Sequence, residues 1–302
     1  MAQRQGICFI SSGDICRGWL FLPTTSGDSK APVIVMAHGL GGVKEMGLEA
    51  YAQRFVESGY ACLVFDYRHF GSSDGEPRQL LDVDRQLADW QAAIDYAREL
   101  SQVDGSRMAL WGSSFGGGHV LVAGTRNPQV AAVIAQCPFT DGVSSALAMD
   151  TWNAVKLSAL ALADVLGSWF GRPPIYVPLA AGPSELAMMN APDVSAGYLS
   201  LVPQGFSFRN EVAARIVLGL FMHAPGRIAR NLRVPALLCV CDSDSVAPAG
   251  ATLKHAAKMP LSEVKRYPLG HFDIYSGAGF ESVMADQLEF IQRQLPVARS
   301  GA

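Results

Sequence analysis

Residues 107–124 read RMALWGSSFGGGHVLVAG and join a short apolar run to a helix-like segment through Gly-x-Ser-x-Gly, from Gly112 to Gly116. A nucleophile at a sharp strand-to-helix turn adopts strained backbone angles, and small residues on either side let neighbouring chains approach closely. The pattern alone arises often by chance, but its place after a strand and before a helix indicates a functional site. We therefore predict that Ser114 is a nucleophile and Ser113 only its neighbour. The alternative is a glycine-rich turn with an incidental serine.

Strand-like runs and longer segments alternate along most of the chain. An antiparallel hairpin is expected first, because Ser-Ser-Gly-Asp separates ICFI (7–10) from CRGWLFL (16–22). Alternation of short strands with segments long enough for helices is typical of a parallel sheet built from βαβ units. The sequence therefore predicts an α/β fold whose mostly parallel, eight-stranded sheet has helices on both faces. The expected strands after the hairpin are VIVMA (33–37), ACLVFD (61–66), RMALWG (107–112), VAAVIAQC (130–137), ALLCVC (236–241) and EVKRYPL (263–269).

One long segment interrupts this alternation. Roughly ninety residues, from 139 to 230, separate two expected strands that a short crossover would otherwise connect. The segment is too apolar for a solvated loop, so we expect a helical lid packed over one edge of the sheet. The domain prediction is a core of residues 1–138 and 231–302 with the lid at 139–230.

The lid carries large apolar side chains that we expect to form an apolar pocket for the acyl or alcohol part of a substrate, although any one of them can instead pack the lid onto the core. Four polar residues interrupt that surface and are expected to be solvated; the alternative is that they orient a polar substrate group. The apolar set is Trp152, Trp169, Phe170, Phe206, Phe208, Phe221 and Met222, and the polar set is Arg209, Asn210, Glu211 and Arg215.

Two backbone N–H groups are candidates for an oxyanion hole. The helix that begins at Phe115 directs its free amides and its positive dipole end toward the reacting oxygen, so the Phe115 N–H is one donor. The glycine-rich loop in VIVMAHGLGG (33–42) is expected to supply the second donor, from Leu40. His38, at the end of that strand, is expected to be structural; its alternative role is that of a catalytic base.

The base and the acid are expected late in the chain. His271 lies just past the last expected strand, in a loop at the edge of the sheet where ligands gather. ALLCVCDSDSVAP offers two acids before it, and Asp244 stands further into the loop, where its carboxylate can turn toward the histidine. We therefore predict His271 as the base and Asp244 as its orienting acid. Asp242 is expected to bind loop amides, and Asp141 is a third candidate for the acid.

The composition of the chain limits the classes of binding partner that we expect. The formal net charge is −3 and there is no run of Lys or Arg, so we expect neither nucleic acid nor a membrane surface as a partner, and a small-molecule acyl substrate remains. The first residues lack the apolar stretch of a signal peptide, which favours a cytoplasmic protein. The six cysteines lie mostly in strand-like runs, and Cys-Val-Cys at 239–241 is too closely spaced for zinc. We expect no metal and no cofactor, and a homo-oligomer is compatible with the sequence.

Four segments carry a resemblance to a known family: HGLGGVKE (38–45), FDYRHFGSSDG (65–75), LWGSSFGGGH (110–119) and LGHFDIY (269–275). Over essentially its whole length the chain resembles the α/β-hydrolase superfamily, and within it the dienelactone-hydrolase-like and acetyl-xylan-esterase-like proteins, which include fungal polyketide-processing hydrolases and acyltransferases. The resemblance implies the α/β-hydrolase fold, a triad of Ser114, Asp244 and His271, and oxyanion donors at Leu40 and Phe115. The dienelactone hydrolases proper differ in using cysteine as nucleophile.

A serine nucleophile favours acyl chemistry. We expect hydrolysis of a carboxylic ester, or of a thioester or lactone, on a small and partly hydrophobic substrate. Acyl transfer, peptide hydrolysis and C–C bond hydrolysis are alternatives because they share the same covalent intermediate. A binding protein that keeps the fold without catalysis is a further alternative, which the presence of all three triad residues disfavours.

Overall fold

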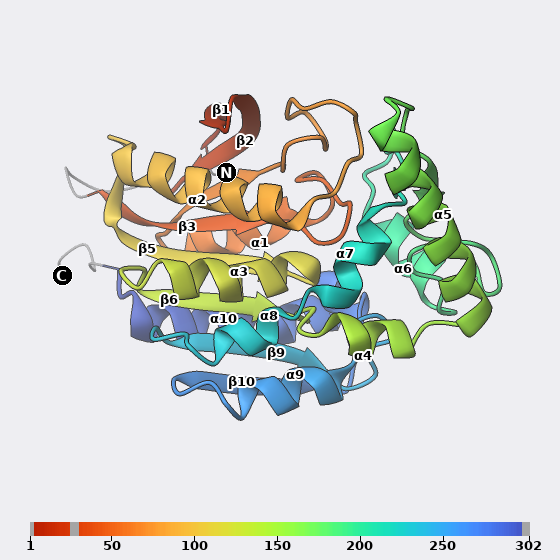
Figure 1. Ribbon diagram of the computed structural model, residues 1–302. Helices are drawn as coiled ribbons and strands as arrows, with labels where there is room; N and C mark the ends of the chain where they lie inside the picture. The colour runs from red at the N-terminus through yellow and green to blue at the C-terminus, as the bar shows by residue number, and fades with distance from the viewer. Residues whose placement is uncertain (1–2, 25–29, 298–302) are drawn as a thin grey trace, which may run out of the picture.

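An eight-stranded sheet forms the centre of the molecule (Figure 1). The computed structural model describes residues 3–24 and 30–297, so the ends of the expected core, residues 1–2 and 298–302, lie outside the described residues. The strands follow the order β1-β2-β4-β3-β5-β6-β9-β10 across the sheet. Their bounds are β1 Gln3–Ser11, β2 Asp14–Leu22, β3 Ala31–Ala37, β4 Ala61–Phe65, β5 Val103–Ser113, β6 Ala132–Gln136, β9 Ala236–Cys241 and β10 Ser262–Tyr267.

Strand direction and burial follow the apolar pattern of the sequence. The pairs β1–β2 and β2–β4 are antiparallel, and every other neighbouring pair of this sheet is parallel. Strands β3, β4, β6 and β9 are buried at every residue, as expected for continuous apolar runs covered on both faces. Burial along β2 largely alternates instead. The predicted mostly parallel, eight-stranded sheet is confirmed.

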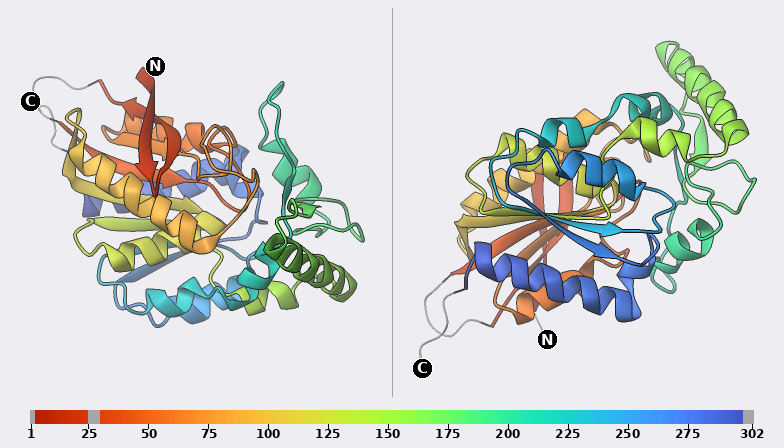
Figure 2. Two further views of the ribbon diagram at one scale, coloured as in Figure 1. Left: turned by 45° about the horizontal axis from the view of Figure 1, so that its top comes forward. Right: turned by 90° about the horizontal axis from the view of Figure 1, so that it is seen from below.

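Helices cover both faces of the sheet (Figure 2). One face packs against α2 (Val83–Glu99), α3 (Phe115–Arg126), α8 (Pro225–Ala229) and α9 (Ala249–Ala256), and the other against α1 (Leu48–Glu57) and α10 (Gly277–Gln294). Helix α2 begins at Val83, because the Asp82 side chain caps it by accepting a hydrogen bond from the Arg85 N–H.

Most of the segment between β6 and β9 lies beyond one end of the sheet, on the right in Figure 1. It contains α4 (Gly142–Leu147), α5 (Thr151–Trp169), α6 (Val194–Ser200) and α7 (Ile216–Met222). It also contains a two-stranded sheet of β7 (Tyr176–Pro178) and β8 (Glu211–Ala213) that the sequence did not predict, because strands of three residues leave no readable period. Helix α8, at the end of the segment, packs against α3 and α9 on the face of the main sheet.

Candidate active site

Four parallel strands bring the predicted site residues to one edge of the sheet. Leu40 follows β3, Ser114 follows β5, Asp244 follows β9 and His271 follows β10. Because the carboxyl ends of parallel strands meet at the same edge, residues far apart in the chain lie side by side there. The segment with α4 to α7 lies beyond this edge.

Ser114 occupies a sharp turn between β5 and α3. Its backbone angles are φ 56° and ψ −119°, an unfavourable conformation for a residue with a side chain, which costs on the order of 1–3 kcal/mol. A Cβ added at Gly112 would lie 2.2 Å from the Gly116 carbonyl oxygen, and one added at Gly116 would lie 2.4 Å from the His38 carbonyl oxygen. The two glycines of the pattern are therefore required by close backbone contact, as the sequence predicted.

A chain of hydrogen bonds connects the three predicted triad residues. His271 Nε2 lies 3.0 Å from Ser114 Oγ, and His271 Nδ1 lies 2.7 Å from Asp244 Oδ2. The other carboxylate oxygen of Asp244 accepts hydrogen bonds from the N–H groups of Val246 and Ala247, at 2.8 and 2.6 Å. These bonds fix the carboxylate against the Nδ1 side of the imidazole, which leaves Nε2 directed at the serine.

The electrostatics of the site favour a proton on His271. Burial of the imidazole disfavours its charged form, but the negative charge of Asp244 and the hydrogen bond to it outweigh that penalty and raise the pKa of His271 well above its ordinary value. An imidazolium formed during a reaction is therefore stabilised where it forms. The arrangement provides a hydroxyl, a proton acceptor and a charge that stabilises the accepted proton.

The second acid of the loop has a different environment from the one predicted. Asp242 Oδ1 accepts a hydrogen bond of 2.8 Å from Arg266 Nε, and this ion pair is partly exposed. The expectation that Asp242 binds loop amides is therefore wrong, since Asp244 binds them itself. Asp141, the third candidate, caps α4 and lies 3.4 Å from His255 Nε2.

Both predicted oxyanion donors belong to segments that lie next to Ser114. Phe115 is the first residue of α3, so its N–H has no acceptor within the helix. Leu40 and Phe115 both line the same cavity as Ser114. The Leu40 loop approaches closely, because a Cβ at Gly39 would lie 2.9 Å from Ser114 Cβ.

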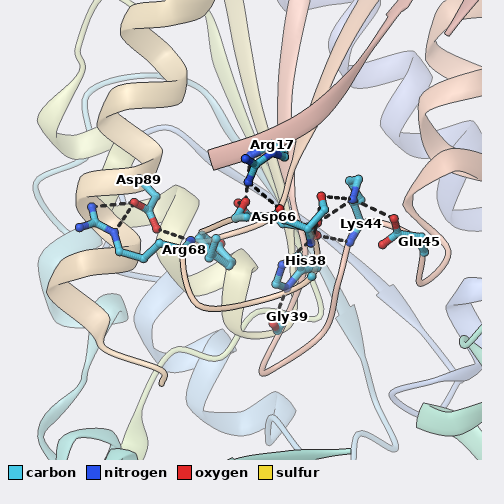
Figure 3. A network of polar contacts seen from close by, with 12 residues as sticks. Arg17, His38, Gly39, Lys44, Glu45, Asp66, Arg68 and Asp89 are labelled. Carbon is cyan, nitrogen blue, oxygen red and sulfur yellow. Dashed lines mark hydrogen bonds and ion pairs between the residues drawn. The ribbon is translucent and has the colours of Figure 1, made fainter. Parts of the chain in front are cut away.

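A buried ion pair connects the loop that contains Leu40 to the residue that follows β4 (Figure 3). Asp66, just past β4, accepts hydrogen bonds of 2.7 Å from both the N–H and the Nζ of Lys44. The Ser72 N–H donates to Asp66 as well, at 3.0 Å. Burial opposes the charge of Lys44, but Asp66 outweighs it and raises the pKa of Lys44. Sequence reasoning missed this pair, because nothing in the local pattern links residues 44 and 66.

His38 belongs to this network (Figure 3). Its Nδ1 lies 3.0 Å from the Gly39 carbonyl oxygen, and its Nε2 lies 3.9 Å from Asp66 Oδ1. Burial lowers the pKa of His38, against the opposing charge of Asp66. The ring packs edge-on against Tyr67, with an angle of 77° between the two rings, which fits the expected structural histidine.

Helix α6 and the residue before it contact three of the four segments that carry the site. The Tyr198 hydroxyl donates a hydrogen bond of 2.8 Å to the Leu40 carbonyl oxygen. Asp193, before the helix, accepts a bond of 2.9 Å from Ser245 in the acid loop. On the base loop, Phe272 packs so closely on Gly197 that a Cβ there would lie 2.5 Å from the ring. This role was not predicted, because a helix of only seven residues leaves a weak periodic pattern.

A cavity of about 400 Å³ opens beside Ser114. Its wall is mostly apolar and comes largely from α4 and the residues that follow it, from α7 and from the loop between β7 and α6, with the polar residues Ser145, Asp150 and Asn190 among them. This size lies at the lower end of small-molecule sites. The apolar wall includes Phe139, Met149, Leu157, Met188, Met189, Val194, Val217, Leu220 and Phe221.

The predicted apolar pocket residues are mostly wrong. Of the seven, Phe221 alone lines this cavity. Trp152, Trp169, Phe170 and Met222 point outward and are 73–83% exposed, while Phe206 and Phe208 pack against the core. The sequence identified α5 as apolar, but it did not show which face of the helix turns inward.

The four polar residues of the segment do not line the cavity. Arg215 forms a bidentate ion pair with the buried Asp164, at 2.8 Å from Nε and from Nη2. Arg209 pairs with Glu211, and Asn210 exchanges hydrogen bonds with the backbone of Ala180. Arg215 and Asn210 connect distant parts of the insertion, which neither hypothesis included, whereas the pair of Arg209 and Glu211 is partly exposed, as predicted for solvated positions.

Cys137, Asp244 and His271 place one potential metal-ligand atom each within 4.8 Å of one another. Both nitrogens of His271 are already engaged, with Asp244 and with Ser114. The donor set therefore fits proton transfer and not metal binding. The Cys137 Sγ lies 3.9 Å from His271 Nε2, close enough to pack against the ring.

Within residues 3–24 and 30–297, no helix combines the length and apolar character that a membrane crossing requires.

The sheet, its covering helices and the serine turn define an α/β-hydrolase. Comparison with known families refines this class: the chain belongs to the family described as serine aminopeptidase, S33, whose model matches residues 28–271. The chain is therefore a hydrolase of this superfamily, as the four quoted segments predicted.

Similar proteins cover nearly the whole chain. The quorum-quenching protein AidA of Acinetobacter baumannii is 53% identical over 287 residues, which are 95% of this chain and 94% of that protein. The polyketide transferase ATR5 of Stachybotrys chlorohalonatus is 28% identical, over 92% of this chain and 93% of its own. Among solved structures, the α/β-hydrolase GrgF of Penicillium has a TM-score of 0.82 at 25% identity and covers 98% of this chain and 100% of its own.

Proposed function

We propose that this protein hydrolyses an ester, lactone or thioester bond next to an apolar acyl chain, with Ser114 as nucleophile. The observation that carries the proposal is the hydrogen-bonded chain Asp244–His271–Ser114, which ends at an apolar cavity of about 400 Å³. A serine hydroxyl is a weak nucleophile unless a base accepts its proton. Here His271 provides the base and Asp244 the acid that orients it.

Acylation involves all three residues of the hydrogen-bonded series Asp244–His271–Ser114. Ser114 Oγ attacks the carbonyl carbon while His271 Nε2 accepts its proton, and Asp244 stabilises the imidazolium. The N–H groups of Leu40 and Phe115 stabilise the oxyanion of the tetrahedral intermediate. The imidazolium then returns the proton to the leaving oxygen or sulfur, and the acyl group stays on Ser114.

Deacylation needs a water molecule near both Ser114 and His271. A second, smaller cavity of about 30 Å³ lies between the Leu40 loop and His271 and also touches Ser114. Its volume suffices for a water molecule, which needs about 10–15 Å³ on this measure. We place the hydrolytic water there, where His271 can take its proton, while the acyl chain occupies the larger cavity.

The similar proteins support two classes of substrate for this reaction. The quorum-quenching protein AidA is 53% identical, which supports a quorum-sensing signal molecule as substrate. That this molecule carries an acyl chain on an ester or lactone bond is our inference from the serine triad and the apolar cavity. The thiohydrolase aneE of Aspergillus aculeatus is 25% identical over 91% of this chain, which supports a thioester as the second candidate. Both bonds react through the same acyl-enzyme.

The insertion at residues 139–230 acts as a lid in this proposal. Its helices supply much of the wall of the larger cavity, and α6 contacts the loops of the site.

The six free cysteines support a cytoplasmic location, where thiols stay reduced.

The test is a panel of substrates with matched acyl chains: p-nitrophenyl esters, N-acyl-homoserine lactones, acyl thioesters and acyl anilides. We expect turnover of the lactones and esters, with kcat/KM increasing with chain length, and no turnover of the anilides. Ser114→Ala measures the background. Turnover of the anilides alone would show a peptidase, and lack of turnover on every member would contradict the proposal.

A further inference from the structure

Helix α5 (Thr151–Trp169) is apolar on two opposite faces. Its inner face buries Leu157 and Ala161 against the rest of the insertion. Its outer face, which we define as Trp152, Val155, Ala159, Leu162, Leu166 and Trp169, is exposed to solvent. Both views in Figure 2 show α5 at the periphery of the molecule. A contiguous exposed apolar stripe of this kind normally marks an interaction surface, and no described residue covers it.

The outer face is large. Its two tryptophans are 73% and 74% exposed, and Phe170, which follows the helix, is 80% exposed. A large aromatic side chain presents roughly 150–250 Å², so these three rings, about three-quarters exposed, offer on the order of 500 Å², and the exposed aliphatic side chains of the face add to this area. Monomeric proteins rarely expose a patch of this kind, and roughly 800 Å² is what each partner contributes to a standard-size interface.

The positions of the apolar residues identify the partner. Trp152 and Trp169, Val155 and Leu166, and Ala159 and Leu162 are three pairs at equal distances from the midpoint between residues 160 and 161. When two copies of such a helix pack antiparallel around a twofold axis, each residue faces its counterpart from the other copy. An isologous dimer needs this self-complementary arrangement, whereas a different partner does not.

The charges also favour a second copy over a lipid surface. Helices that lie on membranes carry a polar face rich in Lys and Arg, but α5 has one lysine, Lys156, and no arginine. The face opposite the exposed stripe is packed against protein. The net charge of −3 offers no attraction to anionic lipid.

We propose that the outer face of α5 binds the same face of a second copy, antiparallel, and that the protein is a dimer in solution. Small Ala159 then lies opposite Leu162 of the other copy near the axis, and the tryptophans pair at the two ends. This proposal is independent of the reaction proposed above, because it rests on the exterior of α5.

The first experiment measures molar mass by light scattering and sedimentation over a wide concentration range. We expect a dimer for the wild type and a monomer for Leu162→Asp. The matched control is Leu261→Asp, since Leu162 and Leu261 are 54% and 50% exposed and Leu261 lies far from α5 in the sequence, just before β10. The Tm of each variant and its turnover of a short ester show that it is folded.

The second experiment tests orientation by disulfide formation in a Cys8→Ser background, because Cys8 is the exposed native cysteine. We expect a mixture of Val155→Cys and Leu166→Cys proteins to form cross-linked dimers and neither protein to do so alone. In the antiparallel arrangement two copies of residue 155 stand about 16 Å apart along the axis, beyond the reach of a disulfide.

Three results would overturn the proposal. One is a monomeric wild type at every concentration. Another is a dimer that Leu162→Asp leaves intact or that Val155→Cys cross-links alone, since either would require a different surface or a parallel arrangement. The third is a wild-type monomer that binds vesicles of anionic or neutral phospholipid and loses this binding with Leu162→Asp, which would make the partner a membrane.

Discussion

The hydroxyl of Tyr198 donates a hydrogen bond of 2.8 Å to the carbonyl oxygen of Leu40. Tyr198 belongs to the insertion and Leu40 to the loop after β3, so one bond links the two parts of the molecule at the reacting centre. Burial raises the pKa of Tyr198 far above its usual range, so the hydroxyl stays protonated and remains a donor at neutral pH. The bond restrains the backbone of the residue whose N–H we assign to the oxyanion hole.

Replacing Tyr198 with Phe is expected to reduce kcat by roughly 2- to 10-fold with little change in KM, because one hydrogen bond contributes about 0.5–1.5 kcal/mol and acts on the transition state. Steady-state kinetics on a p-nitrophenyl ester measures this. Tyr176→Phe is the matched control, since Tyr176 also donates from the insertion to a backbone carbonyl, that of Arg78. Equal kinetics for the two variants would show that Tyr198 does not position Leu40.

Asp66→Ala is expected to lower the free energy of unfolding by up to about 3–5 kcal/mol, because it removes the fully buried carboxylate that pairs with Lys44 and leaves only Glu45, 2.8 Å from Nζ, as its counter-charge. The side chains of Lys44 and Asp66 are 4% and 0% exposed. Denaturant unfolding measures the loss. The control is Glu263→Ala, which removes an exposed ion pair with Arg293 and is expected to cost less than about 1 kcal/mol. A loss for Asp66→Ala no larger than for Glu263→Ala would contradict this account of the loop.

Much of the fold was predictable, because its signals are local. Each buried strand appears as a short apolar run, and the serine turn requires its two glycines within five residues. The pairing of Lys44 with Asp66 was not predictable, because charge pairing across 22 residues depends on the tertiary fold. The cavity wall was misassigned for a related reason: α5 is apolar on both faces, and the sequence does not show whether Leu157 or Trp169 turns inward.

Activity is expected to rise with pH, with a midpoint above the ordinary imidazole value of about 6.5. His271 accepts the proton of Ser114 only when neutral, and Asp244 raises the pKa of His271, so neutral imidazole becomes abundant at higher pH than for a free histidine. The dependence of kcat/KM on pH measures the midpoint. Asp244→Asn should lower both the midpoint and the rate, whereas Asp242→Asn should leave the midpoint in place. A wild-type midpoint below 6.5 would argue against this coupling.

Ala154→Phe is expected to abolish the preference for long acyl chains while it preserves turnover of the acetate ester. Ala154 lines the larger cavity from the inner face of α5, so a phenyl ring there occupies the space of the acyl chain. In the wild type each added methylene should raise kcat/KM by up to about fourfold, from about 0.8 kcal/mol of burial. Trp169→Ala is the control, because Trp169 points outward. An unchanged chain-length series for Ala154→Phe would place the acyl chain elsewhere.

Intact-mass spectrometry and peptide mapping after brief exposure to a slowly hydrolysed p-nitrophenyl ester test the central claim most directly. We expect one acyl group per chain on the peptide that contains Ser114, and no adduct on Ser114→Ala. His271→Ala should acylate slower by about 10⁴-fold or more, as expected when a triad member is removed. An acyl group on another residue, or turnover by Ser114→Ala above a tenth of the wild-type rate, would contradict the assignment of Ser114 as the nucleophile.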